Sequence, residues 1–220
     1  MSWVRCPGRG KKIRMGLATT TLRIAVGGLS AGHGLQKLTD KFGGSGPEGT
    51  APSFERMGFE PGKPYAMAAG VAETVGGALL ATGMWTPLGA AMLTGVQATA
   101  IAKVHAKNGL WVHKGGFEYN ATLIAAAFAV TEAGPGFPSI DGLVAKRRKG
   151  FGWALAELAL GLGAAAATVA LSERGKDLAG KQREVSSEPA SIVTDATRQT
   201  ADTVAAGADS AAEAARTASS

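Results

Sequence analysis

Apolar and small residues fill five segments of the chain, and polar stretches separate them. The segments are residues 15–36, 65–85, 87–104, 119–133 and 151–171. Each is long enough, or nearly so, to cross a hydrocarbon core, which takes about 20 helical residues. None shows the polar face that a helix on the surface of a water-soluble bundle needs. The pattern therefore predicts an all-α, polytopic transmembrane helical bundle with five spans.

Alanine and glycine are abundant in these segments, whereas large apolar residues are sparse. In lipid, the hydrophobic effect does not drive helices together, and small residues favour helix association because they allow the backbones to approach closely. The same faces could also join copies of the chain into a homo-oligomer. We expect close helix contacts at three small pairs, which are Gly28/Gly32, Gly77/Ala81 and Ala91/Gly95.

Charge divides the chain further. Residues 1–14 form a basic leader without acids, residues 15–145 a membrane core and residues 151–171 an additional span. Arg23 inside the first apolar run and the lack of an A-x-A site predict an uncleaved first span rather than a signal peptide. Residues 172–220 are polar and rich in Ser, Thr and Ala, which predicts a disordered tail or at most a marginal surface helix.

The basic residues also predict the orientation. The leader and the Lys-Arg-Arg-Lys cluster at residues 146–149 fall on the same side of a five-span arrangement. Cytoplasmic loops carry the excess of Lys and Arg. We therefore expect a multi-pass protein of the cell membrane with a cytoplasmic N-terminus. The net charge of +6 reports this topology, and no basic surface interleaved with aromatic residues points to nucleic acid.

Arg23 lies in the middle of the first predicted span, where an Arg costs about 2.5 to 3.5 kcal/mol. Glu73 occupies the second span, at a depth that differs from that of Arg23 by about one helical turn when the span ends are aligned. These positions predict a buried Arg23–Glu73 ion pair. Such a pair either fixes the register of the two helices or marks a functional site.

A second polar cluster is predicted at the outer ends of the spans. Its members are His33, Lys37, His105, Glu118 and Tyr119. Imidazoles there could ligate a metal or haem, bind a quinone carbonyl and pass protons, or only cap helix ends. We treat the five residues as a candidate ligand or proton site, with a quinone as the candidate cofactor, and we predict no metal site.

A loop motif follows the fourth span. Ser139 and Asp141 come after a Gly-Pro-Gly-Phe-Pro turn, where such side chains cap the next short helix or contact a partner on the cytoplasmic face. Glu132 and Glu157 lie near the same boundary, where the cluster at 146–149 can neutralise them. We therefore assign these two carboxylates no chemistry.

Enzyme signatures are missing from the sequence. Cys6 is the single cysteine, so the chain has no CxxC redox pair, no CxxCH haem attachment and no cysteine-based zinc site. The P-loop and HExxH motifs are absent as well, and no GxGxxG string follows a predicted strand. These absences favour an accessory subunit over a self-contained enzyme.

Several collinear motifs carry a resemblance to a known family. They are Arg23 followed by HGLQKL at 33–38, GTAPSFERMGFEPGKPYA at 49–66, VAETVGGALLATGMWTPLGAA at 71–91, His105, GGFEYN at 115–120 and GPGFPSID at 134–141. Over about residues 15–145 the chain resembles the DoxX family of small integral membrane proteins. The resemblance implies a four-helix core. The positions that match the family motifs are Arg23, Lys37, Glu73, His105, Glu118, Tyr119 and Asp141.

The family resemblance also implies a function. Members include the small membrane subunit of an archaeal thiosulfate:quinone oxidoreductase and actinobacterial relatives linked to a membrane complex that counters oxidative stress. We therefore expect a noncatalytic or accessory subunit of a membrane redox or oxidative-stress complex, linked to quinone and to a peripheral enzyme. The alternative is a noncatalytic protein that binds lipid or another small molecule, or holds partners together. The fifth span and the tail depart from the family pattern.

Overall fold

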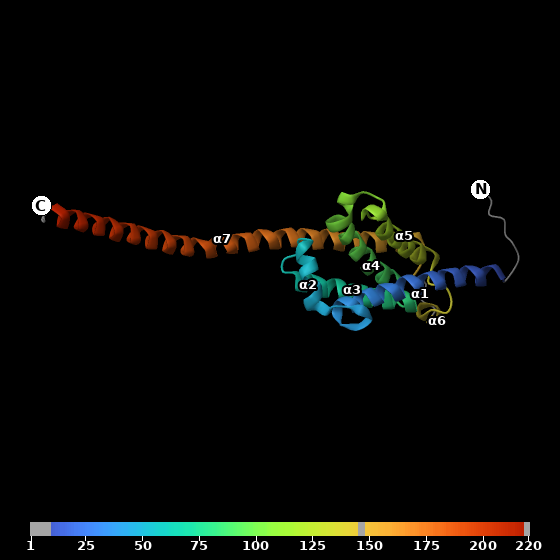
Figure 1. The fold of residues 1–220 in the computed structure, drawn as a ribbon. Helices are drawn as coiled ribbons and strands as arrows, with labels where there is room; N and C mark the ends of the chain where they lie inside the picture. Colours follow the sequence, from blue (N-terminus) through green and yellow to red (C-terminus); the bar gives the residue numbers. More distant parts are fainter. Residues whose placement is uncertain (1–9, 145–147, 218–220) are drawn as a thin grey trace. The chain divides into compact units, whose positions relative to one another are not determined.

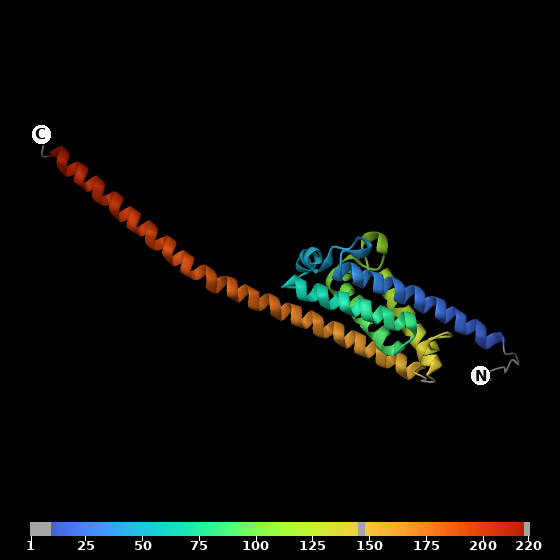
Figure 2. The ribbon, with the colours of Figure 1, turned by 90° about the horizontal axis from the view of Figure 1, so that it is seen from below.

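The computed structural model describes residues 10–144 and 148–217, and these residues form helices and loops without strands. The α-helices are α1 (Gly10–Leu38), α2 (Gly46–Arg56), α3 (Gly62–Thr82), α4 (Thr86–Ala100), α5 (Glu118–Ala133), α6 (Ile140–Leu143) and α7 (Phe151–Thr217). Short helical turns lie at Lys41–Gly43, Ala106–Asn108 and Val112–Lys114, and a π-helical segment, η2 (Ile101–His105), continues α4. Figures 1 and 2 show α1, α3, α4 and α5 side by side.

All five predicted segments are helical, which confirms the all-α prediction. The helix α2, in the charge-balanced loop after α1, was not predicted. Among the described residues, only the helical segment Phe151–Leu178 is long and apolar enough to cross a membrane, judged by its length and composition alone. Its mean hydropathy is 1.8. The helix α5 has 16 residues, fewer than the about 20 that a full span takes, and α4, with 15, approaches that length only together with η2. The five-span topology therefore stays a prediction.

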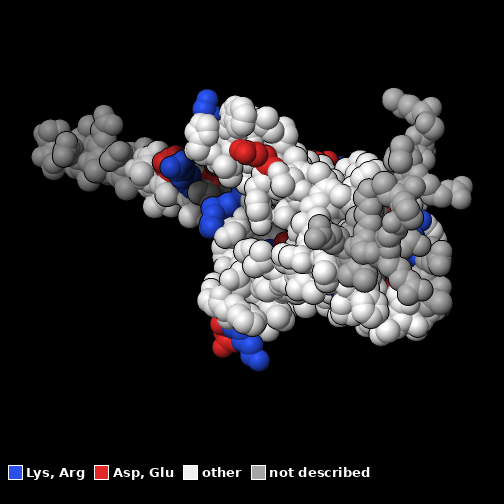
Figure 3. All heavy atoms as spheres, turned by 90° about the vertical axis from the view of Figure 1, so that its right-hand side faces the viewer, with Lys and Arg blue, Asp and Glu red and all other residues white. Residues whose placement is uncertain are grey.

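The distribution of side chains is the reverse of that in a water-soluble protein. Large apolar side chains point outward, among them Leu17 and Leu160, which are 54% and 57% exposed. Charged side chains lie inside, among them Arg23 and Glu157, which are each 2% exposed. On the face drawn in Figure 3, most of the described surface carries no charged side chain. Charged residues that face a bundle interior and apolar residues that face outward are typical of proteins in lipid.

Helices α1 and α3 touch backbone to backbone. A Cβ atom on Gly27 would lie 2.5 Å from the carbonyl oxygen of Gly77, and a Cβ atom on Gly77 would lie equally close to that of Gly27. Nothing lies within 4 Å of the corresponding point on Gly28 or Gly32. The predicted contact at Gly28/Gly32 is therefore wrong, because the face that meets α3 starts one residue earlier. The prediction for Gly77/Ala81 is confirmed.

A second close contact joins α4 to α7. A Cβ atom on Gly161 would lie 2.8 Å from the carbonyl oxygen of Ala91, and one on Gly95 would lie 3.3 Å from that of Gly161. The small pair Ala91/Gly95 thus forms a helix contact, as predicted. The apolar core of the bundle lies between α3, α4 and α5. It consists of Leu80, Ala90, Leu93, Ala127 and Val130.

Of the two alternatives predicted for the tail, the structure shows a helix rather than disorder. Helix α7 continues to Thr217, and its part from Lys176 onward belongs to a second compact unit, separate from the unit that ends at Gly175. Alanine, the best helix former, is frequent in this part of the chain. The helix propensity of the tail is therefore sufficient without the apolar residues that a core would need. The basic leader lies outside the described residues, apart from the first turns of α1.

Candidate functional site

A cavity of about 1000 Å³ lies between the helices of the bundle, and six α-helices contribute to its walls. Most of the wall is apolar or small, with Leu29 from α1, Ala72 from α3, Met92 from α4, Leu123 from α5 and Ala164 from α7. Small-molecule sites are mostly apolar cavities of several hundred Å³ with a few polar groups that orient the ligand. The cavity therefore has the size and the walls of a ligand site.

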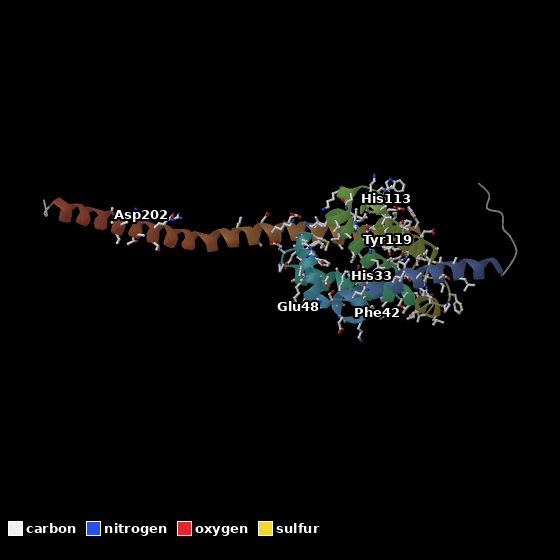
Figure 4. The ribbon with its side chains drawn as sticks, in the orientation of Figure 1. His33, Phe42, Glu48, His113, Tyr119 and Asp202 are labelled. Carbon is white, nitrogen blue, oxygen red and sulfur yellow. The ribbon has the colours of Figure 1, made fainter. Side chains whose placement is uncertain are left out.

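Four of the five residues predicted for the outer polar cluster line this cavity. They are His33 and Lys37 on α1, His105 on η2 and Tyr119 on α5, and Figure 4 labels two of them. The fifth residue, Glu118, does not line the cavity. Its Oε2 instead accepts a hydrogen bond from the backbone N–H of Val112 at 3.0 Å. Glu118 therefore holds the loop before α5.

An ion pair lies on the cavity wall between α1 and α3. Lys37 Nζ is 2.5 Å from Glu73 Oε2, and it also donates to the carbonyl oxygen of His33 at 3.3 Å. The Glu73 side chain is almost fully buried, whereas about a quarter of the Lys37 side chain is exposed. The helices can come this close because Gly34 has no side chain: a Cβ atom there would lie 2.6 Å from the carbonyl oxygen of Gly70.

The predicted Arg23–Glu73 pair is wrong. Arg23 Nε donates to the carbonyl oxygen of Pro135 at 2.6 Å, and its other two nitrogens donate to the carbonyl oxygens of Ala81 and Pro138. On α3, Ala81 is eight residues beyond Glu73, a distance of about 12 Å along a helix. Aligning the span ends misplaced the register, because the glycine contacts between α1 and α3 set it instead. Arg23 thus fastens the loop after α5 to α1.

The two histidines on the cavity share one tautomer. His105 Nδ1 lies 2.7 Å from the carbonyl oxygen of Gly115, which can only accept, so Nδ1 carries the proton. His33 Nδ1 lies 3.1 Å from Gln36 Oε1, and Gln36 Nε2 donates to the carbonyl oxygen of Phe42. That second bond fixes the orientation of the amide, so His33 also carries its proton on Nδ1. In the neutral form, both imidazoles therefore keep Nε2 as a hydrogen-bond acceptor.

The π-helical segment η2 positions two of the cavity residues. It follows α4 directly and brings both His105 and Lys103 to the cavity wall. The Lys103 ammonium forms an ion pair with Glu173 on α7, and it lies 5.1 Å from the centre of the Phe59 ring. Local π-helical turns are frequent at functional sites. The segment also ties α4 to α7 at this end of the cavity.

Sequence reasoning missed an amide pair on the cavity wall. Asn120 Nδ2 on α5 donates to Gln97 Oε1 on α4 at 2.7 Å, and both residues line the cavity. Asn120 is 7% exposed. The signal that could have identified Gln97 and Asn120 is that each is a polar residue within a predicted membrane helix. They were missed because their spacing matches no catalytic or metal-binding motif.

The loop motif after α5 lies at the other end of the bundle. Ser139 caps α6, since its Oγ accepts from the N–H of Gly142 at 3.2 Å, which confirms the capping prediction. Asp141 pairs with Arg148 at 2.9 Å, and the Arg148 guanidinium lies 3.9 Å from the centre of the Trp85 ring. None of these residues lines the cavity. Of the predicted basic cluster, residues 146 and 147 lie outside the described residues.

Glu157 pairs with neither Arg148 nor Lys149, the two members of the predicted basic cluster that the structure describes. It is buried against α4, where its Oε1 accepts from Thr94 Oγ1 at 2.5 Å. Its Oε2 is buried without a hydrogen-bond partner in the described part of the chain. The carboxyl group faces inward because Gly161, one turn later, brings α7 against α4. Glu157 thus joins these two helices.

No group of three or more His, Cys, Asp or Glu side chains that could hold a metal ion occurs among residues 10–144 and 148–217. The polar groups on the cavity wall are the Lys37–Glu73 ion pair, the Lys103 ammonium, two imidazoles, two phenols, two amides and the hydroxyl groups of Ser30, Thr99 and Thr168. These groups can donate and accept hydrogen bonds and exchange protons.

The comparison with protein families found a match to the family model described as DoxX, over residues 18–106. The match confirms the resemblance drawn from the sequence motifs for this part of the chain. It covers α1 to η2 and ends before α5, α6 and α7. No curated protein and no solved structure matches the chain.

Proposed function

We propose that the chain is a membrane protein that binds an amphipathic small molecule as an accessory subunit of a membrane redox or oxidative-stress complex, in line with its match to the DoxX family model over residues 18–106. One observation carries this proposal. A single cavity combines apolar walls from six α-helices with the Lys37–Glu73 ion pair and two imidazoles.

The proposal includes a multi-pass topology with a cytoplasmic N-terminus. The outward-facing leucines and the inward-facing Arg23 and Glu157 support several lipid-facing helices rather than one. Cysteine labelling at Ser45 and at Leu143, from each side of sealed vesicles, tests the topology. Ser45 should react from outside the cell and Leu143 from inside. Labelling of both residues from the same side would refute it.

A quinone fits the polar groups of the cavity. The Lys37 ammonium has three N–H donors, of which Glu73 and the His33 carbonyl take two, so one remains for a quinone oxygen. The Nε2 atoms of His33 and His105 can accept the protons of the reduced form. When bound, a quinone would supply two-electron chemistry coupled to protons. The residues of this chain hold the ring, exclude water and exchange protons, and a peripheral enzyme would supply the electrons.

Binding of 2-methyl-1,4-naphthoquinone to the purified protein in lipid nanodiscs tests the ligand. Titration calorimetry should give saturable binding, and Lys37→Met should weaken it roughly tenfold because a charge-assisted donor is lost. Lys63→Met is the matched control, since Lys63 also pairs with a glutamate, Glu48, but lies on the surface away from the cavity. Equal affinity of wild type and Lys37→Met would refute the proposed site.

The apolar walls also favour a second candidate, a lipid-binding protein without a redox role. An acyl chain needs only the apolar part of the cavity, to which all six α-helices contribute. Native mass spectrometry of protein purified from its own membranes distinguishes the two. Retained quinone together with a copurified peripheral enzyme supports the accessory subunit. Retained phospholipid or fatty acid alone supports the lipid-binding protein.

A further inference from the structure

We infer that the Gln97–Asn120 amide pair selects a ligand that carries a hydroxyl group on a ring, such as a phenol or a quinol, over the same ligand with an acceptor-only oxygen. This inference rests on the proposed binding of a small molecule in the cavity. It adds the chemical form that is bound: the reduced, hydroxyl-bearing one.

The hydrogen bond within the pair determines what remains for a ligand. Asn120 Nδ2 donates to Gln97 Oε1 at 2.7 Å, so Gln97 Nε2 is left as a donor and Asn120 Oδ1 as an acceptor. Within the described residues, the bond between the two amides is the one hydrogen bond that either side chain makes. If both amide groups were turned over, the pair would still present one donor and one acceptor. The complementarity therefore does not depend on which amide donates.

The position of the pair makes it part of the binding site. Both residues line the cavity, and Asn120 is more than nine-tenths buried. Contact between α4 and α5 does not require the amides, because Leu93, Ala127 and Val130 already pack the two helices together. The two amides instead place polar atoms on an otherwise apolar stretch of wall, close to His105 in the sequence of α4 and η2.

A hydroxyl group matches the pair, whereas an ether or a ketone does not. The oxygen of a hydroxyl can accept from Gln97 Nε2 while its hydrogen is donated to Asn120 Oδ1. An ether or ketone oxygen can accept only, and it would leave Asn120 Oδ1 covered and without a donor. Sites built to bond a hydroxyl group reject analogues that lack it, because a buried polar atom is then left unpaired.

The test uses two redox-stable probes, 4-nonylphenol and 4-nonylanisole, which differ by one O-methyl group. Titration calorimetry with the full-length protein in nanodiscs should show the phenol binding roughly tenfold more tightly than the anisole. In Asn120→Leu, which is similar in shape but has no acceptor, this ratio should fall to about the ratio of the two partition coefficients into the same nanodiscs. Thr99→Val is the control, because Thr99 lines the cavity but its hydroxyl donates to the carbonyl oxygen of Gly95.

Gln97→Met provides a second variant in case Asn120→Leu unfolds, as judged by its melting temperature. It should weaken phenol binding and reduce the phenol preference, since the donor to the ligand oxygen is lost. Binding of both probes with the wild-type ratio in the folded variants would overturn the inference and leave the ligand site standing. Binding of neither probe to the wild type would overturn the inference together with the proposed function.

Discussion

Lys37 on α1 and Glu73 on α3 form a 2.5 Å ion pair on the wall of the cavity, and Arg23 has no part in it. The pair joins the two helices at the end where both cavity histidines lie, and Arg23 joins the same helices at the other end. The Lys37–Glu73 pair therefore joins α1 to α3 at the cavity. Arg23 joins the two helices, and the loop after α5, at the opposite end of the bundle.

Removing one member of the Lys37–Glu73 pair should destabilise the protein through the charge that remains. We expect Lys37→Met to lower the free energy of unfolding by about 2 kcal/mol, less than the 3–5 kcal/mol of a fully buried pair, because 24% of the Lys37 side chain is exposed. Lys37→Met combined with Glu73→Leu should recover most of this loss. Thermal unfolding in detergent measures both variants, and strictly additive effects would show that the pair is not coupled.

Arg23 should not be replaceable by lysine. Its fork of donors reaches the carbonyl oxygens of Ala81, Pro135 and Pro138 at once, whereas an ammonium group on a shorter stem cannot span them. We expect Arg23→Lys to cost about 2 kcal/mol of stability and to expose the loop at 134–139 to proteolysis. The readouts are the melting temperature and the cleavage rate of that loop. A wild-type cleavage rate would contradict the proposed fastening.

Two adjacent glycines on α1 should respond in opposite ways to the same substitution. Gly27→Ala places a Cβ atom 2.5 Å from the backbone of α3, so we expect a loss of about 1–3 kcal/mol from overpacking. Gly28→Ala places its Cβ atom in open space and should be neutral or stabilising by up to about 1 kcal/mol, because alanine is the better helix former. Melting temperatures compare the two, and a similar loss in both would refute the register of α1 against α3.

The hydrogen bond between Thr94 on α4 and Glu157 on α7 predicts that the effects of substituting these two residues on stability are coupled. Thr94→Val removes the one hydrogen-bond donor that contacts the buried carboxyl group and should cost about 1–3 kcal/mol. Combining it with Glu157→Leu should restore stability, because two apolar partners leave no polar atom unpaired. Glu157→Gln alone should be close to wild type, since the amide oxygen can still accept from Thr94. Unfolding followed by a fluorophore on α7 reports each effect.

The sequence was sufficient to predict where the helices lie along the chain, but not how the helices pack against one another. Uninterrupted apolar and small segments predicted five helices, and the outer polar residues His33, Lys37, His105 and Tyr119 do line one cavity. The register of α1 against α3 could not be predicted, because it depends on which glycine face makes contact, and Gly27 and Gly28 look alike in a sequence. The helix α2 was missed since its charge balance resembles that of a loop.

The amide pair on the cavity wall escaped sequence reasoning for a related reason. Gln97 and Asn120 are 23 residues apart on different helices, and only the packing of α4 against α5 brings them together. Glu157 was assigned to the basic cluster because it is near that cluster in the chain. Its orientation is determined by Gly161, which brings α7 against α4, and a contact between two helix backbones leaves no signature in residue type alone.

Direct backbone contact at Gly27–Gly77 leaves no side chain between α1 and α3 at that level. A shift of one of these helices against the other would have to break that contact together with the Lys37–Glu73 pair. We therefore expect the opening of the cavity to involve α4, α5 or α7 more than a separation of α1 from α3.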